Sequence, residues 1–71
     1  MKYYDIHVSY GAISGFSVFI PIKKGILPTE QTDEDIIGHA VDVGSLEPDD
    51  MKYVDKVTEI DEDEYNRATK A

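Results

Sequence analysis

Apolar and polar residues alternate along the first part of the chain. In residues 3–10 the even positions are apolar or aromatic, and the alternation returns in residues 16–22. A period of two is typical of a strand with one buried face. Two such runs joined through the glycine-bounded segment 11–15 predict a β-hairpin. Pro21 cannot donate a ladder hydrogen bond, so we expect the second strand to end there or to lie at an edge.

The spacing of apolar residues becomes helical after the connection 23–31. Thr32 precedes three acidic residues, and apolar residues then recur with a helical period in residues 36–41. A Thr N-cap followed by acids suits the free amides and the dipole at a helix start. Gly44 predicts the C-terminal stop. The pattern indicates a helix of about three turns, in which Gly38 costs about 1 kcal/mol relative to Ala.

Residues 51–60 fit either a helical face or a strand. The segment is rich in β-branched residues, which favour a strand. A third strand would also stabilise a hairpin that is marginal by itself. We therefore predict a strand here, with a bulge because neither register alternates perfectly. We expect residues 45–50 to form a loop.

Four consecutive acids at positions 61–64 begin the last predicted element. Asp61 is expected to cap a short helix that has Glu64 at its third position, as in a capping box. Asp63 and Arg67 have the spacing of an i,i+4 ion pair. The chain is thus predicted to form one α+β domain over residues 1–71. It consists of a three-stranded antiparallel sheet of ββαβ order, one covering helix and a short C-terminal helix.

The predicted core collects the apolar faces of these elements. It comprises Tyr4, Ile6, Val8, Tyr10, Phe16, Val18, Ile20, Ile36, Ile37, Ala40, Val41, Val54, Val57 and Ile60.

Charge is distributed unevenly along the chain. The net charge is -8, yet residues 32–71 alone carry four basic and thirteen acidic side chains, which leaves -9 in that part. Phosphate affinity depends on Lys and Arg, so direct binding to nucleic acid is disfavoured. An anionic membrane should repel the chain as well. Attraction to a basic protein surface is the interaction that this charge favours.

The composition indicates a cytoplasmic protein. Cysteine is absent, which removes disulfides and thiolate metal sites and fits a reducing compartment. No apolar run approaches the roughly 18 residues of a membrane span. The alternating N-terminal segment is unlike a signal peptide, and we expect the chain to be complete as written.

Motifs for catalysis are missing from the sequence. There is no cysteine nucleophile, no nucleophile elbow and no phosphate-binding glycine loop. We therefore predict that the protein is not an enzyme and needs no cofactor. His7 and His39 are the only histidines, and with nearby carboxylates they are the candidate ligands for a metal site, should one exist.

The acidic residues near the C-terminus are the leading candidates for a binding surface. We expect a partner-binding acidic face that consists of Asp49, Asp50, Asp61, Glu62, Asp63 and Glu64. Five tyrosines support an interaction role, because Tyr is common in binding surfaces. Such a face can dock on a basic cleft, and spaced carboxylates can resemble a row of phosphates. Helix capping and solubility are the structural explanations for the same acids.

The order of these segments resembles a known group of small proteins. MKYYDIHVSY, the aromatic-rich second strand, the acidic helix TDEDIIGHAVDVG and the closing YVDKVTEIDEDEY are similar to DpnD/PcfM-like proteins of phages and mobile elements in Gram-positive bacteria. The connection KKGILPTEQ is longer than in that group, and Gly38 departs from its pattern. The resemblance implies an accessory protein of a mobile element and transfers no site residues.

The sequence therefore predicts a non-enzymatic, acidic protein-binding module. Its expected partner has a basic surface, such as a nuclease, which it would inhibit in the manner of anti-CRISPR or anti-restriction proteins. Two alternatives remain open. One is an oligomeric or accessory structural protein that pairs through a sheet edge, and the other is a small metal-binding domain that uses His7 and His39.

Overall fold

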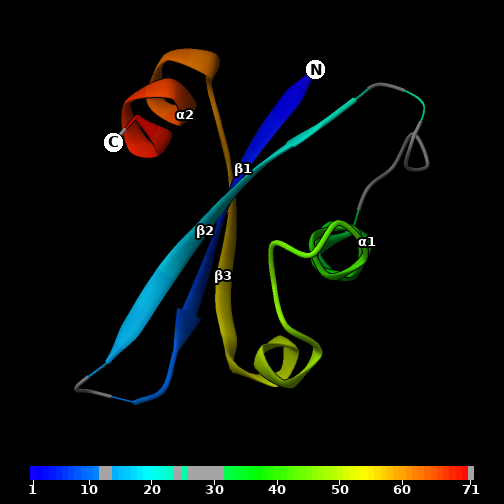
Figure 1. Ribbon diagram of the computed structural model, residues 1–71, viewed down its shortest axis with the longest axis vertical. Helices are drawn as coiled ribbons and strands as arrows, with labels where there is room; N and C mark the ends of the chain where they lie inside the picture. The colour runs from blue at the N-terminus through cyan, green and yellow to red at the C-terminus, as the bar shows by residue number, and fades with distance from the viewer. Residues whose placement is uncertain (12–13, 24, 26–31, 71) are drawn as a thin grey trace.

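The computed structural model describes residues 1–11, 14–23, 25 and 32–70. It confirms the α+β class, with a three-stranded antiparallel sheet and two α-helices (Figure 1). The elements are β1 (Lys2–Ser9), β2 (Gly15–Ile22), α1 (Asp33–Asp42), the 3₁₀-helix η1 (Pro48–Tyr53), β3 (Val54–Ile60) and α2 (Glu62–Thr69). Most of the connection 23–31 lies outside the described residues.

The N-terminal strand is the centre of the sheet. The strand order is β2-β1-β3, and both neighbours run antiparallel to β1. Ile6, at the middle of β1, lies opposite Val18 of β2 and Val57 of β3. Since side chains alternate between the two faces of a strand, one face of this sheet is almost entirely apolar at its centre. The predicted hairpin is confirmed by the pairing of β1 with β2.

The prediction of a strand over residues 51–60 is only partly correct. Residues 48–53 form η1, and the strand begins at Val54. Pro48 stands at the start of η1, where its missing amide removes no hydrogen bond. The expected bulge is confirmed, because the register with β1 shifts between His7 and Val8. His7 lies opposite Lys56 and Val8 opposite Val54, so Asp55 is the extra residue.

The core lies between the sheet and α1. The buried side chains are Tyr4, Ile6, Val8, Ile20, Ile22, Ile36, Ala40 and Leu46. Val18, Ile37, Val41, Val54 and Val57 pack against this cluster and are partly buried. Ile22 and Leu46 were not expected there.

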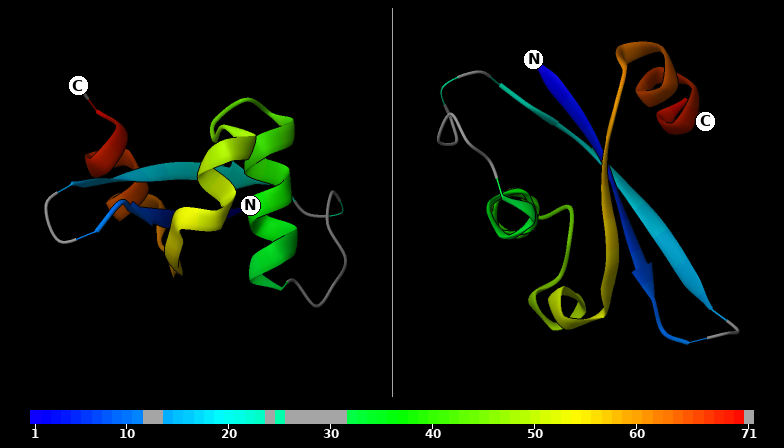
Figure 2. Two further views of the ribbon diagram at one scale, coloured as in Figure 1. Left: turned by 90° about the horizontal axis from the view of Figure 1, so that it is seen from below. Right: turned by 180° about the vertical axis from the view of Figure 1, so that it is seen from behind.

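Three of the predicted core residues lie elsewhere. Ile60 lies opposite Tyr3, so it belongs to the other face of the sheet. Tyr10 and Phe16 lie at the hairpin end, and their side chains are 44% and 40% exposed. The reason is the direction of α1, which runs across the strands rather than along them (Figures 1 and 2). A helix is about 10 Å wide, and a strand of eight residues is about 26 Å long, so α1 covers only a band of the sheet.

The second helix packs on the opposite face of the sheet. Tyr65 of α2 contacts Tyr3 of β1, with ring centroids 4.7 Å apart. Tyr3 and the core residue Tyr4 are neighbours in a strand, so their side chains point to opposite faces. Figure 1 accordingly shows α2 and α1 on the two sides of the sheet. The far part of this second face, with His7 and Ser17, is exposed.

Both ends of α1 are capped by its own sequence. The Thr32 hydroxyl accepts a hydrogen bond from the Asp35 amide, and the Asp35 carboxylate accepts one from the Thr32 amide. This is a complete capping box. At the other end Gly44 has φ +80°, and the Ser45 amide donates to the Ala40 carbonyl at 2.9 Å. That bond and the one from Gly44 to Val41 define a Schellman motif, which confirms the predicted stop.

Two alanine substitutions of glycines, one within α1 and one just beyond its end, should have opposite effects on stability. A Cβ at Gly38 would meet nothing within 4 Å, so Gly38→Ala should stabilise the domain by about 0.5–1 kcal/mol. Gly44→Ala should destabilise it by about 1–2 kcal/mol, because Gly44 has a left-handed backbone. Urea unfolding followed by circular dichroism measures both. Equal effects of the two substitutions would contradict the assigned ends of α1.

A second pair of substitutions tests how far the core extends along β2. Ile20 and Phe16 point to the same face of that strand, yet Ile20 is 1% exposed and Phe16 is 40% exposed. Ile20→Val should lower the free energy of unfolding by about 0.5–1.5 kcal/mol. Phe16→Leu should change it by less than about 0.5 kcal/mol. If Phe16→Leu proved the more damaging in urea, the core would extend to the hairpin end.

Candidate protein-binding surface

The acids at positions 61–64 form the N-cap and the start of the first turn of α2 and are all exposed. We call them the terminal cluster. Asp61 is the N-cap, and its carboxylate accepts a hydrogen bond from the Glu64 amide at 2.7 Å. This confirms the predicted cap, which satisfies a free amide and favours negative charge near the helix start. Glu62 and Asp63 take no part in that hydrogen bond, so their carboxylates are available to a partner.

Asp49 and Asp50 lie in η1, together with Glu47 at its N-cap. We call these three residues the η1 cluster. Figure 1 shows η1 at one end of the molecule and α2 near the other, along a longest dimension of 36 Å. The six acids predicted as one face therefore occupy two separate places, because β3 runs from one to the other.

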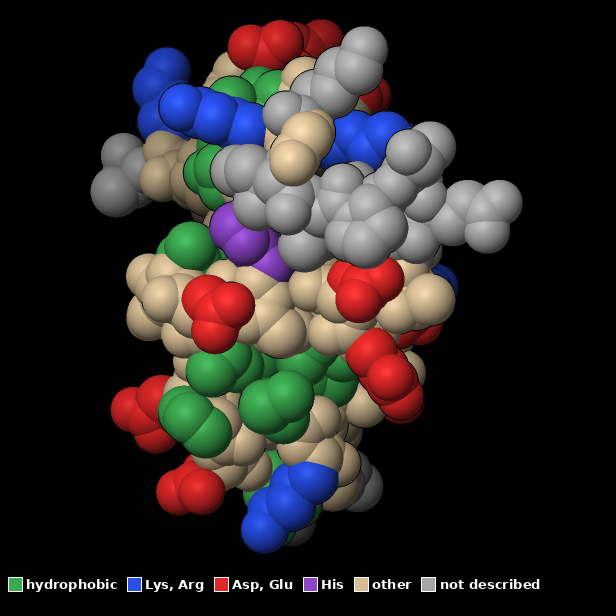
Figure 3. Space-filling model, turned by 90° about the vertical axis from the view of Figure 1, so that its right-hand side faces the viewer, with side chains coloured by type: hydrophobic (Ala, Val, Ile, Leu, Met, Phe, Trp, Pro, Cys, Tyr) green, Lys and Arg blue, Asp and Glu red, His purple; other side chains and the backbone are tan. Residues whose placement is uncertain are grey.

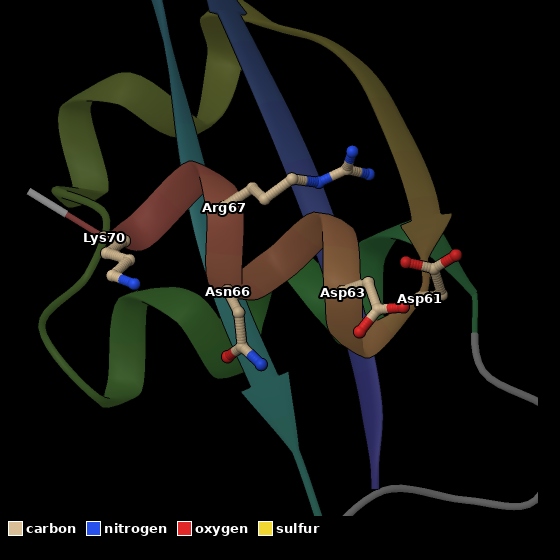
Figure 4. A pocket seen from close by; sticks show the side chains of 5 residues that line it. All are labelled: Asp61, Asp63, Asn66, Arg67 and Lys70. Carbon is tan, nitrogen blue, oxygen red and sulfur yellow. The ribbon is translucent and has the colours of Figure 1, made fainter.

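No acid of either cluster forms an ion pair with another described residue. The pairs within 4.0 Å that the described chain forms are Lys2–Glu59 at 3.8 Å and His7–Asp55 at 3.5 Å. The predicted pair between Asp63 and Arg67 is wrong. Figure 4 shows that the Arg67 and Asp63 side chains extend from α2 in different directions. Neither cluster is neutralised by the neighbouring cations of its own element.

A shallow depression lies along the exposed side of α2. Its lining is Asp61, Asp63, Asn66, Arg67 and Lys70. Figure 4 shows these side chains pointing in different directions rather than toward a common centre. A binding site for a small molecule needs a few convergent polar groups in a concave, mostly apolar setting. The depression therefore has the character of open helix surface.

The two histidines lie on opposite sides of the sheet. His7 is an odd-numbered residue of β1 and shares the face of Tyr3, whereas His39 belongs to α1 on the other face. The sheet thus separates the candidate ligands of the metal-site alternative. Within the described ranges, no group of three or more His, Asp or Glu side chains could hold a metal ion.

Asp5 has a buried carboxylate oxygen, Oδ1, that lacks a hydrogen-bond partner among the described residues. It lies on the face of α2, directly opposite Phe19 of β2 and Thr58 of β3. Acid–base chemistry requires a second titratable group whose pKa differs from the first, in a shared site. No described side chain forms an ion pair or hydrogen bond with Asp5, so the geometry does not assemble such a pair.

The hairpin end carries a cluster of exposed aromatic rings, and two of these residues, Tyr10 and Phe16, were predicted to lie in the core. The Tyr10 ring lies between two others, with centroid distances of 5.9 Å to Phe16 and 5.0 Å to Tyr53. All three side chains are at least 40% exposed. We call these three residues the aromatic end. A contiguous group of exposed rings is typical of the central part of a protein interface.

The aromatic end and the η1 cluster are joined by a hydrogen bond. The Tyr10 hydroxyl donates to the Asp50 carboxylate, across 40 positions of the sequence. This bond, with the negative charges of Asp50 and Glu47, raises the pKa of Tyr10 to about 12. Lys52 Nζ lies 5.3 Å from the centroid of the Tyr53 ring, within cation–π range. One surface therefore combines aromatic rings, carboxylates and the ammonium group of Lys52.

Further apolar side chains are exposed between α1 and η1. Val43, at the end of α1, is 56% exposed, and Met51 of η1 is 42% exposed. On the face that carries α1, Figure 3 shows hydrophobic side chains gathered in the lower half, with acidic side chains on either side. The apolar surface at this end of the molecule is thus bordered by acidic side chains on two sides and by a basic one at its lower edge.

Comparison of the chain with protein-family models, with curated proteins and with solved structures finds no match. The similarity to DpnD/PcfM-like proteins therefore stays a prediction from the sequence pattern. No helix in the described part of the chain has the length and apolarity needed to span a membrane.

The Tyr10–Asp50 bond gives the domain a specific alkaline titration. The folded pKa of Tyr10, about 12, lies above the ordinary value of 10.0, so folding favours the protonated phenol. The stability that this group contributes should be complete below pH 10 and should be lost as the pH rises through 12. The ¹³C shift of the Tyr10 ring, followed by NMR against pH, measures the midpoint.

Removal of the acceptor should return this midpoint toward 10. In Asp50→Asn the Tyr10 phenol loses its charged acceptor, whereas in Asp49→Asn the acceptor remains and the midpoint should stay near 12. If Asp49→Asn lowered the midpoint as much as Asp50→Asn, general negative charge and not the hydrogen bond would raise the pKa.

Proposed function

We propose that this protein is a non-enzymatic protein-binding module of the phage or mobile-element type. It docks on the basic surface of an enzyme that handles nucleic acid, such as a nuclease, and inhibits it. The observation that supports this proposal most directly is that the carboxylates of both acidic clusters lack ion-pair partners among the described residues. Unpaired, mostly exposed carboxylates steer the protein toward a positively charged partner and repel anionic ones.

The length of the molecule suits a nucleic-acid cleft. The longest dimension of the molecule is 36 Å, and the terminal and η1 clusters lie toward its two ends. One turn of duplex DNA spans about 34–36 Å. A cleft lined by Lys and Arg over that length can contact both clusters at once. Docking there would exclude the nucleic acid, because the protein would occupy the phosphate-binding residues of the cleft.

Self-pairing through a sheet edge is the second candidate, and one observation favours it. In the part of the chain that the structure describes, β2 has a neighbouring strand on one side only, and no charged residue lies within Gly15–Ile22. Uncharged edge strands are templates for strand addition, whereas β3 carries Asp55, Lys56 and Glu59 beside its bulge. Pro21 restricts any added strand to the earlier part of β2.

The proposal predicts salt-sensitive capture of a partner from a bacterial lysate. The tagged protein should retain a nucleic-acid-handling enzyme at low ionic strength and release most of it at about 1 M salt, where the Debye length is about 3 Å. Glu62→Lys with Asp63→Lys, or Glu47→Lys with Asp49→Lys, should each weaken binding about 5- to 10-fold. These four residues leave the Asp61 cap and the Asp50 hydrogen bond intact.

The matched control adds negative charge in place of removing it. Arg67 lies on the same helix as Glu62, and the Arg67→Glu variant should bind the partner equally well or more tightly. The recovered enzyme must also lose activity when the protein is added, or the inhibitory part of the proposal fails. Undiminished capture by both doubly reversed variants would overturn the electrostatic docking. Recovery of nothing but the chain itself would favour pairing through the edge of β2.

A further inference from the structure

The aromatic end has the properties of a binding surface for a cationic side chain. Its three rings are contiguous, and Tyr10 at the centre contacts both Phe16 and Tyr53. The faces of aromatic rings carry partial negative charge, so they attract ammonium and guanidinium groups. Lys52 already demonstrates this on Tyr53, with its Nζ 5.3 Å from the ring centroid.

Carboxylates next to the rings supply the second half of such a site. Asp50 is held by the Tyr10 hydroxyl, which fixes one of its oxygens at the border of the aromatic end. Glu47 belongs to the same turn, where its carbonyl accepts a hydrogen bond from the Asp50 amide at 2.9 Å, and its charge contributes to the raised pKa of Tyr10. A purely apolar partner would lose free energy by covering these charges. The surface therefore fits a partner group that is flat, weakly hydrated and positively charged.

We propose that the aromatic end binds an arginine side chain on a segment of a partner protein. The guanidinium stacks on the Tyr53 and Tyr10 rings, and its N–H groups donate to the Asp50 and Glu47 carboxylates. Arginine suits this site better than lysine, because its planar group stacks on rings and matches a carboxylate with two parallel hydrogen bonds. The inference rests on the proposed function in that both require a basic partner, and it adds the place and the residue type.

The rest of the chain offers one competing occupant. Arg67 is the single arginine of the sequence, and it lies exposed on α2, near the opposite end of the molecule from η1. A second copy could therefore place its α2 on the aromatic end. The net charge of -8 opposes such self-association, which is why a basic partner protein is the better assignment.

The test uses two short peptides as probes, one of alternating glycine and arginine and one of alternating glycine and lysine. Titration of the ¹⁵N- and ¹³C-labelled protein should shift the signals of Tyr10, Phe16 and Tyr53. The arginine peptide should bind about two- to fivefold more tightly than the lysine peptide. Tyr53→Leu keeps an apolar side chain and should weaken the binding of the arginine peptide by about the same factor.

Tyr65→Leu is the matched control, because Tyr65 also lies in a ring pair but on α2. It should leave both peptide affinities unchanged. The aromatic site would be overturned if both peptides bound equally well, and if Glu62→Lys but not Tyr53→Leu weakened that binding. Electrostatic docking would stand in that case. Shifts of Tyr53 that depend on protein concentration alone, and that Arg67→Gln abolishes, would overturn the assignment to a partner protein.

Discussion

The direction in which α1 packs across the strands limits how much of the sheet the core can cover. Ile6 and Val8 of β1 are completely buried, and they belong to one buried cluster with Ala40 of α1, which is also completely buried. A chain of this size buries only about 60% of its unfolded surface, so it cannot extend such a core along the full length of the sheet. Because α1 runs across the strands, the apolar face is covered in one band (Figure 2). The ends of the sheet must be covered in another way or remain exposed.

The chain covers the two ends differently. Near the N-terminus of β1, α2 packs on the other face through Tyr65 and Tyr3. At the hairpin end Leu46 is buried against the core, whereas the rings of Tyr10 and Tyr53 contact each other and stay largely exposed. Places where a sequence follows the core pattern without being buried are expected at functional sites. The exposure of the aromatic end is therefore informative, and it follows directly from the narrowness of the core.

The first two strands, most of β3, both α-helices and the caps of Thr32 and Asp61 could be predicted, because each depends on residues close together in the sequence. Periodicity also identified the face to which Tyr10 points, since alternation does not depend on length. Periodicity could not show that α1 leaves Tyr10 uncovered, because the area that a helix covers depends on the angle at which it crosses the strands. The separation of Asp50 from Asp61 has a similar origin. Both belong to one acidic half of the chain, yet the length of β3 lies between them.

The two acidic clusters differ in what the fold itself requires of them. The terminal cluster begins α2, where Asp61 caps the helix and negative charge is favourable, so local structure accounts for much of it. The η1 cluster has no such account, because Glu47 makes no capping hydrogen bond and η1 is too short to have a strong dipole. Of its three acids, only the Asp50 side chain accepts a hydrogen bond from another described residue, the Tyr10 hydroxyl. Helix capping therefore accounts for less of the η1 cluster than of the terminal cluster, and the η1 cluster is the one that lies beside exposed rings.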